Sequence, residues 1–276
     1  MGSLKNVRSI WLIGASSGIG LALAEELASD DRVLYLSARH RDALDELANR
    51  LPGRTVSLPL DITDKESLDG AAKIIGDQGT GLDMVIINAG TCEYIDVGDI
   101  DIAAARRVMD TNFWGALFTV SAVLPLLRTA RLMRPSTRPR LVFVSSSVTY
   151  LALPRAGAYG ASKAALRYFA ESLRLDLQHK GIDVRVVSPG FVKTPLTDRN
   201  DFSMPFLMDA DRAARCIVKG LAGSRFDIHF PGRFTRLLKT VALLPDFLRH
   251  RLLGGLSRHT RTSASAEAET GGPAGK

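Results

Sequence analysis

The pattern of apolar and polar positions switches repeatedly between two periods from the start of the chain to Phe230. Short, almost continuously apolar runs predict strands at residues 7–15, 32–38, 55–60, 82–90, 140–147, 183–190 and 225–230. Between these runs, apolar residues recur at helical spacing and predict helices at residues 18–29, 41–51, 64–75, 101–128, 156–180 and 209–222. Strands this apolar have no solvent-exposed face, so the pattern predicts a parallel sheet covered by helices on both sides. Right-handed crossovers then give an α/β fold with a Rossmann-type doubly wound parallel sheet.

The pattern changes beyond Phe230. Because no linker-like segment precedes it, residues 1–231 are predicted to form a single domain. Residues 232–259 predict a basic amphipathic helical extension, whose two helices are separated by Pro245. Residues 260–276 contain no apolar side chain larger than alanine and are predicted to be disordered.

Composition and charge narrow the class of protein. Hydrophobic residues make up 46% and charged residues 24% of the chain, as in ordinary soluble globular proteins. The formal net charge of +7 is concentrated in residues 128–140 and 225–261. Such basic stretches are either solvated faces or contact sites for phosphates, nucleic acid or a membrane surface. The two cysteines, Cys92 and Cys216, lie far apart and predict no disulfide framework, which favours a reducing compartment such as the cytoplasm.

Targeting and metal-binding signals are weak in this sequence. The N-terminal apolar stretch "SIWLIGA" is too short for a signal peptide, and we find no apolar run long enough to span a bilayer. The five histidines show no metal-ligand spacing, so no metal site is predicted.

A cluster of three glycines follows the first predicted strand and opens the first predicted helix. Gly14, Gly18 and Gly20 stand in the stretch "IGASSGIG". In a doubly wound sheet this turn lies at the carboxyl end of the strand, where a helix N-terminus can bind phosphate. The spacing differs from the G-x-G-x-x-G dinucleotide fingerprint, so by itself the cluster fits either a tight turn or a dinucleotide site.

The end of the second predicted strand bears on the choice of dinucleotide. An acidic residue there would bind the ribose 2′-hydroxyl and select NAD. This chain has Ala38 followed by Arg39, whose guanidinium suits a 2′-phosphate. If a dinucleotide binds, the sequence therefore predicts NADP in preference to NAD.

Tyr159 and Lys163 are four residues apart within a predicted helix and so share one face. An ammonium held close to a phenol favours the phenolate and lowers the pKa of the phenol, toward the range that suits a general acid or base. The pair occurs by chance on many helices and needs support from the rest of the chain.

That support comes from six motifs. They are "GASSGIG" (14–20), "LDIT" (60–63), "NAG" (88–90), "TNFWG" (111–115), a serine run followed by "YGASK" (159–163), and "SPGFVKT" (188–194). In composition and order they resemble the classical short-chain dehydrogenase/reductase family from about Val7 to Phe230. The resemblance implies an enzyme that interconverts an alcohol and a ketone or aldehyde with NADP(H).

The resemblance also implies roles for individual residues. Tyr159 is expected to be the general acid/base, Lys163 to tune it and hold the nicotinamide ribose, and Ser146 to bind the carbonyl oxygen. Ser147 is the neighbour that could be confused with Ser146, although alternation along the strand end lets only one of the two face the site. Asn112 is expected to complete a water-linked proton relay to Lys163. Besides Arg39, Tyr159 and Lys163, the expected cofactor-binding residues are Gly14, Ser16, Ser17, Gly18, Ile19, Gly20, Asp61, Ile62, Asn88, Ala89, Gly90, Pro189, Gly190, Val192 and Thr194.

Partners follow from the same comparison. We expect a small-molecule substrate, a homodimer or homotetramer, and no nucleic acid.

The substrate-specifying segments are 151–158 and 194–208, and the second is expected to form a mobile lid over an apolar pocket. Its apolar residues suggest a bulky or lipophilic substrate, although the same side chains could be core residues: Phe202, Met204, Phe206 and Met208. A dinucleotide-binding redox sensor or scaffold without turnover is the alternative function.

The C-terminal extension carries an apolar stripe flanked by cations. The stripe is formed at helical spacing by Phe234, Leu237, Leu238, Val241 and Ala242. It fits an interfacial helix on an anionic membrane, and equally a helix that packs beside the substrate pocket. Packing is favoured, because an unpacked stripe this apolar would promote aggregation. We expect the extension to border the substrate pocket and to offer its basic outer face either to anionic lipid or to the head group of an acyl substrate. The expected location is cytoplasmic, at a membrane surface if the first of these two alternatives holds.

Overall fold

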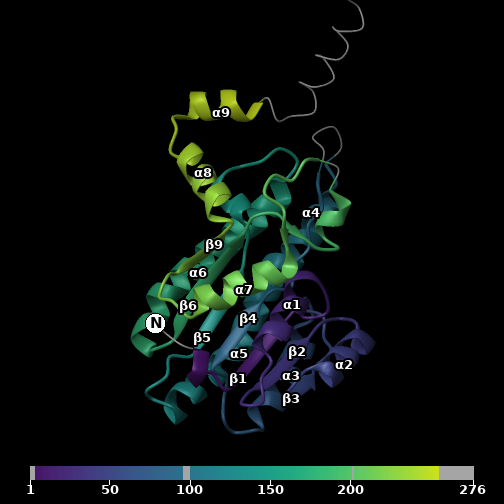
Figure 1. Ribbon diagram of the computed structural model, residues 1–276, viewed down its shortest axis with the longest axis vertical. Helices are drawn as coiled ribbons and strands as arrows, with labels where there is room; N and C mark the ends of the chain where they lie inside the picture. Colours follow the sequence, from purple (N-terminus) through teal and green to yellow (C-terminus); the bar gives the residue numbers. More distant parts are fainter. Residues whose placement is uncertain (1–3, 96–99, 201, 255–276) are drawn as a thin grey trace, which may run out of the picture.

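Seven parallel strands form one sheet in the computed structural model, which describes residues 4–95, 100–200 and 202–254 (Figure 1). In spatial order the strands are β3 (Arg54–Ser57), β2 (Val33–Ser37), β1 (Ser9–Ile13), β4 (Met84–Ile87), β5 (Arg140–Val144), β6 (Asp183–Pro189) and β9 (Asp227–Phe230). A separate parallel pair is formed by β7 (Val192–Lys193) and β8 (Met208–Asp209). The order reverses between β1 and β4, which are direct neighbours. In a doubly wound sheet, ligands bind at this reversal, outside the carboxyl ends of the strands.

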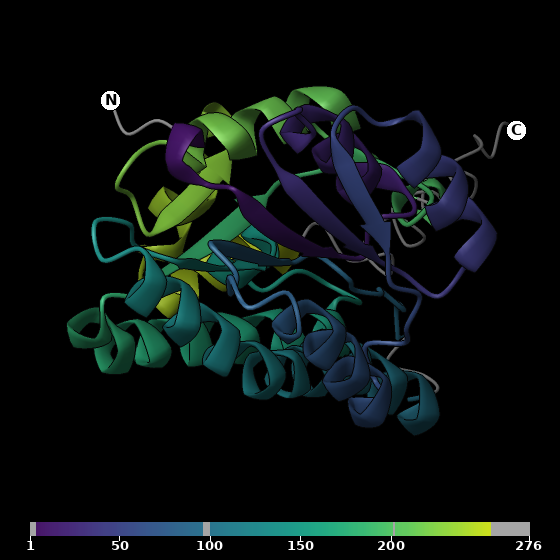
Figure 2. The ribbon, with the colours of Figure 1, turned by 90° about the horizontal axis from the view of Figure 1, so that it is seen from below.

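Helices cover both faces of the sheet (Figure 2). One core contains residues of α1 (Gly18–Leu27), α2 (Arg41–Arg50) and α7 (Ala210–Leu221), and the other contains residues of α3 (Lys65–Gly76), α5 (Gly115–Met133) and α6 (Gly157–Leu177). Along β1, Ile10 and Leu12 belong to the first core, whereas Trp11 and Ile13 belong to the second. Since successive side chains of a strand point to opposite faces, this division confirms the predicted sheet with two covered faces.

The longest predicted helix ends later than expected. It starts as α4 (Ile102–Met109), passes through a π-helical turn, η2 (Asp110–Trp114), and continues as α5 to Met133. The predicted end at Arg128 was wrong because the apolar period continues through Ala130, which is fully buried. The basic stretch beyond it is partly bound within the protein, since Arg134 donates to the Asp83 carboxylate at 2.7 Å.

Other boundaries shift by a few residues. The predicted strand at 55–60 is only β3, and the predicted helix at 156–180 ends at Leu177 and is followed by a 3-10 turn, η4 (Gln178–Lys180). Further 3-10 turns are η1 (Leu4–Asn6), η3 (Ser147–Tyr150) and η5 (Thr197–Arg199). The continuous helix Ile102–Met133 is long and apolar enough to cross a membrane, but 44% of its most apolar window is buried. Because its apolar residues pack in the core with α3 and α6, it is a core helix of the α/β fold.

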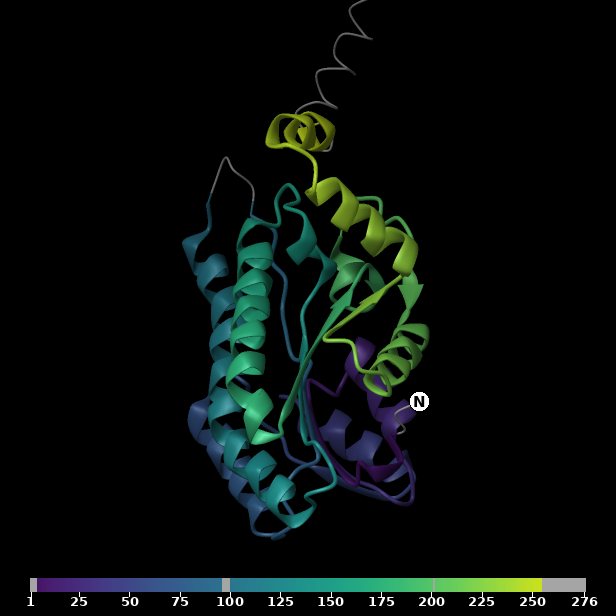
Figure 3. The same cartoon turned by 90° about the vertical axis from the view of Figure 1, so that its left-hand side faces the viewer.

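The C-terminal extension consists of α8 (Gly232–Ala242) and α9 (Asp246–Gly254). Phe234 and Leu238 of α8 are buried and pack with Leu151. By contrast, none of the nine residues of α9 is buried, and this helix lies beyond the end of the sheet (Figures 1 and 3). The tail predicted to be disordered, 260–276, lies outside the described residues.

Candidate active site

A cavity of about 1040 Å³ opens at the carboxyl ends of the central strands. Its wall combines the turn after β1 with the ends of β2, β4, β5 and β6 and with the segment 192–197. It therefore occupies the position at which the strand order reverses. All the predicted cofactor-binding residues except Gly20 line it: Gly14, Ser16, Ser17, Gly18, Ile19, Arg39, Asp61, Ile62, Asn88, Ala89, Gly90, Tyr159, Lys163, Pro189, Gly190, Val192 and Thr194.

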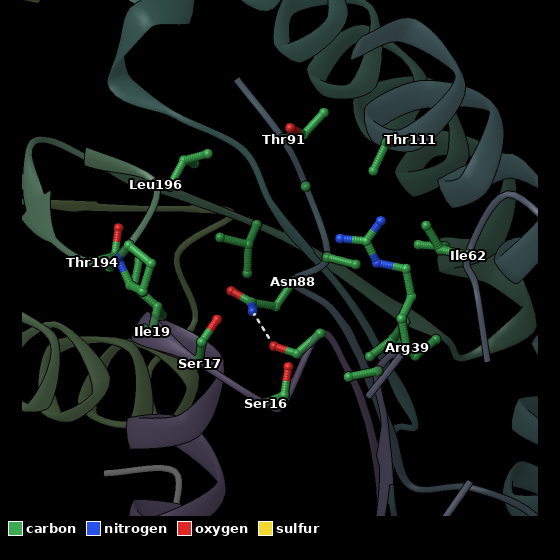
Figure 4. Close-up of a pocket in the computed structure, with 18 of the residues that line it drawn as sticks. Ser16, Ser17, Ile19, Arg39, Ile62, Asn88, Thr91, Thr111, Thr194 and Leu196 are labelled. Atoms are coloured by element: carbon green, nitrogen blue, oxygen red, sulfur yellow. Dashed lines mark hydrogen bonds between the residues drawn. The ribbon is translucent and has the colours of Figure 1, made fainter. Parts of the chain in front are cut away.

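Each glycine of the first turn is required for a different structural reason. Gly14 and Gly18 have φ values of +89° and +53°, which favour glycine. Gly20 has no such conformation and does not line the cavity, so its expected contact with the cofactor stays a prediction. A Cβ at Gly20 would lie 1.8 Å from the Gly14 carbonyl oxygen. Its role is to let α1 approach the turn, which the Asn88 amide also braces by donating to that oxygen at 2.7 Å (Figure 4).

The dimensions and chemistry of the cavity fit a dinucleotide. The N-terminus of α1 faces it with Ser16 and Ser17 on its wall, and a helix N-terminus binds phosphate well. Arg39 is exposed and reaches over the opening beside Ile62 (Figure 4). A Cβ at Gly14 would lie 2.5 Å from the Ala89 amide nitrogen, so at this point the backbone of the turn and the backbone after β4 are in direct contact. Among the residues that the structure describes, no group of three or more His, Cys, Asp or Glu side chains is arranged to hold a metal ion.

Ser146, Tyr159 and Lys163 line the cavity together. Ser146 follows β5 and adopts an extended conformation (φ −159°), whereas the next residue begins η3. Ser147 is buried and does not contribute to the wall, as alternation at the strand end predicts for one of the two serines. The Ser146 hydroxyl is close enough to the Tyr159 phenol to lower its pKa in part, and both groups line the same cavity.

The electrostatics of this pair differ from the sequence prediction. Burial raises the pKa of Tyr159 to about 12, although hydrogen bonding by Ser146 lowers it in part. Burial lowers the pKa of Lys163 to about 8. In this structure the pKa of Tyr159 therefore lies above its ordinary value, whereas the spacing of the pair suggested a lowered one. The Lys163 Nζ instead donates to the Val144 carbonyl oxygen at 3.0 Å, and desolvation dominates both groups.

Asn112 lies behind the cavity wall rather than on it. The π-helical turn η2 carries it, and its amide donates to the Thr91 carbonyl oxygen at 2.8 Å and to the Ser162 hydroxyl at 2.9 Å. A Cβ at Gly90 would lie 3.0 Å from the Asn112 Oδ1 and 3.1 Å from the Lys163 Nζ. The two side chains therefore approach the same glycine, although they are far apart in sequence.

Several wall residues were not predicted from the sequence. Among them are His40, Thr91, Glu93, Arg107, Thr111, Trp114, Phe118 and Ser145. Thr111 and Trp114 stand in the "TNFWG" motif, so the motif itself was the signal. The Arg107 guanidinium donates to Glu93 at 2.7 Å, and nothing in the sequence links these two segments.

Aromatic residues form a continuous row beside the catalytic end of the cavity. Neighbouring ring centroids lie 5.5–6.0 Å apart in the order Tyr94, Phe202, Phe191, Phe234 and Phe206. The row joins the predicted lid to α8, whereas Met208 is buried in β8 and belongs to the core. Cys92 lies next to Tyr94, and burial raises the pKa of its thiol to about 11, which makes it a poor nucleophile at neutral pH.

Comparison with known proteins decides the family. The family model for short chain dehydrogenases matches residues 8–203 of the chain. The chain belongs to the short-chain dehydrogenase family. It is accordingly an oxidoreductase that acts on CH–OH groups with a nicotinamide dinucleotide, and the alternative of a sensor without turnover is set aside.

Relatives of this dehydrogenase support the assignment. An uncharacterized oxidoreductase of Myxococcus xanthus is 34% identical over 87% of this chain and 93% of its own. The 11-beta-hydroxysteroid dehydrogenase 1A of Arabidopsis thaliana is 36% identical over 70% of this chain and 55% of its own. Among solved structures, a short chain dehydrogenase from Burkholderia cenocepacia in complex with NADP superimposes with a TM-score of 0.77 at 25% identity, covering 91% of this chain and 99% of the other.

Proposed function

We propose that this dehydrogenase interconverts an alcohol and a ketone or aldehyde with NADP(H), using Tyr159 as general acid/base. The observation that carries the proposal is the meeting of Tyr159, Ser146 and Lys163 on one cavity wall with the glycine turn. The nicotinamide dinucleotide, when bound, supplies or accepts the hydride. The protein has to bind the carbonyl oxygen and exchange a proton with it.

Each catalytic group has a distinct task in this proposal. The Ser146 hydroxyl donates a hydrogen bond to the substrate oxygen and holds it beside the phenol of Tyr159. Tyr159 gives its proton to that oxygen during reduction and takes it back during oxidation. Because the pKa of Tyr159 is raised to about 12, the phenol stays protonated at neutral pH, which suits reduction. Lys163 supplies positive charge as negative charge develops on the phenol oxygen. Asn112 fixes the backbone of Thr91 beside Lys163 and takes part in the proton relay.

The cofactor is held by the remaining wall residues. The turn Gly14–Gly18 and the N-terminus of α1 receive the pyrophosphate, and Arg39 receives the 2′-phosphate. Asp61 and Ile62 contact the adenine, and the backbone of Asn88–Gly90 lines the adenosine. Pro189, Gly190, Val192 and Thr194 hold the nicotinamide ring, and Lys163 holds its ribose. Gly20 supports the turn from below.

Replacement of Arg39 tests the cofactor preference. Arg39→Ala should weaken NADPH binding by about 10–100-fold and leave NADH binding within about twofold, since only the 2′-phosphate distinguishes them. Fluorescence titration with both reduced cofactors measures the ratio. Arg41 lies two residues further along the chain and does not line the cavity. Arg41→Ala removes the same charge there, and it should change the affinity for neither NADPH nor NADH. An unchanged affinity ratio in Arg39→Ala would exclude Arg39 as the group that binds the 2′-phosphate.

A serine pair gives a matched test of substrate binding. Ser146→Ala should lower kcat/KM for carbonyl reduction by about 10²-fold, because one hydrogen bond to the reacting oxygen is lost in a buried site. Ser147→Ala makes the same change at the buried neighbour and should cost less than about threefold. Steady-state kinetics on both variants measure the difference. If Ser147→Ala has the larger effect, the assignment of Ser146 fails.

The aromatic row supports a bulky, lipophilic substrate. Phe202 and Phe206 are 39% and 53% exposed, so part of the row is open to a ligand. Tyr94 connects this surface to the catalytic end, since the nearby Cys92 and Tyr159 both contribute to raising the pKa of its phenol. An apolar body lying on the row would leave its carbonyl at Ser146 and Tyr159.

Peripheral contact with an anionic membrane is a second part of the proposal. Phe247, Leu248 and Leu252 of α9 are exposed beside Arg249 and Arg251. An exposed apolar surface with flanking cations fits the interface of an anionic bilayer. In α8, by contrast, Phe234 and Leu238 of the stripe are buried, whereas Leu237 is 55% exposed. The predicted homodimer or homotetramer, the division into residues 1–231 and 232–259, and the cytoplasmic location stay predictions.

Vesicle binding tests the membrane contact. The protein should co-sediment with vesicles containing anionic phospholipid at low salt, and not with neutral vesicles. Leu252→Ser should weaken this binding severalfold, whereas Leu175→Ser, at an equally exposed leucine of α6, should not. Absence of binding to anionic vesicles would remove the membrane contact from the proposal.

A further inference from the structure

The Asp227 carboxylate receives donors from four different elements. Its side chain is only 14% exposed at the start of β9. The Tyr150 hydroxyl donates to it at 2.7 Å and the Ser188 hydroxyl at 2.8 Å. The Lys239 ammonium lies at 3.0 Å and the Arg167 guanidinium at 3.2 Å. Burial alone would raise the pKa of Asp227, but these neighbours, led by Tyr150 and Arg167, hold it below its ordinary value, so the group is charged.

Three of the four donors stand next to groups of the proposed active site. Tyr150 ends the short turn η3 that follows Ser146. Arg167 comes one helical turn after Lys163 on α6, and Ser188 directly precedes Pro189 and Gly190 at the end of β6. One carboxylate thus connects the segments that carry the catalytic serine, the catalytic helix and the nicotinamide side of the cavity.

The fourth donor belongs to the C-terminal extension. Lys239 lies on α8 and its Nζ is also 4.4 Å from the centre of the Tyr150 ring, so it contacts the cluster twice. One and a half turns earlier, Phe234 packs on the active-site backbone, since a Cβ at Gly190 would lie 2.9 Å from its ring. Phe234 also belongs to the aromatic row through Phe191 and Phe206. The position of α8 therefore sets part of the proposed substrate surface.

The carboxylate and the lysine of this cluster lie outside the part of the chain that matches the family model, whereas Arg167 lies inside it. That match ends at residue 203, before Asp227 and Lys239. A buried ion pair is by itself weak evidence for stability, because desolvation offsets the attraction. The cluster is better explained as a device that fixes the relative position of the elements around it. The four donors can reach the one carboxylate only when α6, β6, η3 and α8 are arranged as they are here.

We propose that Asp227 is a positioning residue that anchors α8, through Lys239, to the back of the active site and so shapes the substrate surface. The proposal rests on the proposed function, because it assigns the aromatic row and the Pro189–Gly190 segment to substrate and cofactor. Loss of Lys239 releases only α8. Loss of the Asp227 charge also releases the segments that carry Ser146, Lys163 and Gly190.

The test compares kinetics with local dynamics in the full-length protein. Lys239→Met should raise KM for a lipophilic carbonyl substrate about tenfold, with kcat within about twofold, because only the substrate surface moves. Asp227→Asn should raise KM similarly and also lower kcat about tenfold. Lys239→Arg keeps a cation beside the carboxylate and should restore KM to within about threefold of the wild-type value. Hydrogen exchange should be at least about tenfold faster in α8 of Lys239→Met than in the wild-type protein.

Asp183→Asn is the matched control for a purely structural ion pair. Asp183 is partly buried at the opposite end of β6 and pairs with Arg185 at 2.7 Å. Its replacement should lower the unfolding midpoint without changing KM or kcat. If Asp183→Asn changes KM as Lys239→Met does, or if α8 exchanges at the wild-type rate in Lys239→Met, the positioning role is excluded. Hydrogen exchange needs no substrate, so a wild-type protein without carbonyl turnover would refute the proposed function while the anchoring of α8 is still decided.

Discussion

Tyr159→Phe should lower kcat for carbonyl reduction by about 10²–10⁴-fold and leave NADPH binding within about twofold of the wild-type value. The phenylalanine ring can pack as the tyrosine ring does, but it has no proton to give to the substrate oxygen. Ser146 would still bind that oxygen, so the loss should appear in kcat more than in KM. Steady-state kinetics and fluorescence titration of NADPH measure the two parts.

Tyr94→Phe is the matched control for this loss. Tyr94 lies in the same region, and burial also raises the pKa of its phenol. Removing its hydroxyl should cost less than about tenfold in kcat, because it has no proton-transfer role in the proposal. A Tyr159→Phe variant that keeps wild-type kcat would refute the assignment of the general acid.

Lys163→Met should separate catalysis from stability. It should lower kcat/KM by about 10²-fold or more, because the positive charge beside the developing phenolate is lost. It should also raise the free energy of unfolding at neutral pH by on the order of 1–3 kcal/mol, because methionine fills a similar volume without a buried charge. Thermal unfolding and kinetics on one protein preparation measure both effects. A variant that loses stability at neutral pH would contradict the desolvated state of Lys163.

The pH dependence of the same variant provides the companion test. Burial lowers the folded-state pKa of Lys163 to about 8, against an ordinary value of 10.5. Between these values the unfolded chain binds more protons, so wild-type stability should rise with pH. The stability difference between wild type and Lys163→Met should therefore shrink as pH rises through this window. In the wild-type enzyme, kcat/KM for NADPH should fall above about pH 8, because Lys163 loses its proton there. In Lys163→Met this decrease of kcat/KM with pH should be absent.

The fold could be predicted in detail because its central strands are almost entirely buried. A continuous apolar run such as β4 or β5 leaves little choice other than a covered parallel sheet. Boundaries were less predictable. The buried Ala130 keeps α5 helical beyond Arg128, although the exposed Met133 adds no apolar contact and the arginines around it suggested a connection.

Most of the candidate site could be predicted because its residues stand in contiguous motifs. The turn after β1, the serine run and "YGASK" each contribute neighbouring residues to the wall of the cavity. Orientation was harder to predict. Gly20 supports the turn from behind and Asn112 lies behind Gly90, because a motif gives the residue type but not the side that faces the cavity.

Properties that depend on tertiary burial could not be predicted from spacing. The spacing of Tyr159 and Lys163 suggested mutual attraction, but full burial reverses the expected direction for the phenol pKa. The Asp227 cluster gave no signal either. Its donors come from residues 150, 167, 188 and 239, and only the folded chain brings them to one carboxylate.

The most direct test of the account is the fate of deuterium from NADPH in which both hydrogens on the reactive carbon of the nicotinamide ring are replaced by deuterium. Wild-type enzyme, Tyr159→Phe and Ser147→Ala would each be incubated with labelled cofactor and a panel of lipophilic ketones and aldehydes. We predict that the wild-type enzyme and Ser147→Ala form an alcohol carrying one deuterium at the carbinol carbon, in equal amount to the cofactor consumed, and that Tyr159→Phe forms almost none. Equal alcohol formation by the wild-type enzyme and Tyr159→Phe, or cofactor consumption without deuterium in the alcohol, would contradict the account.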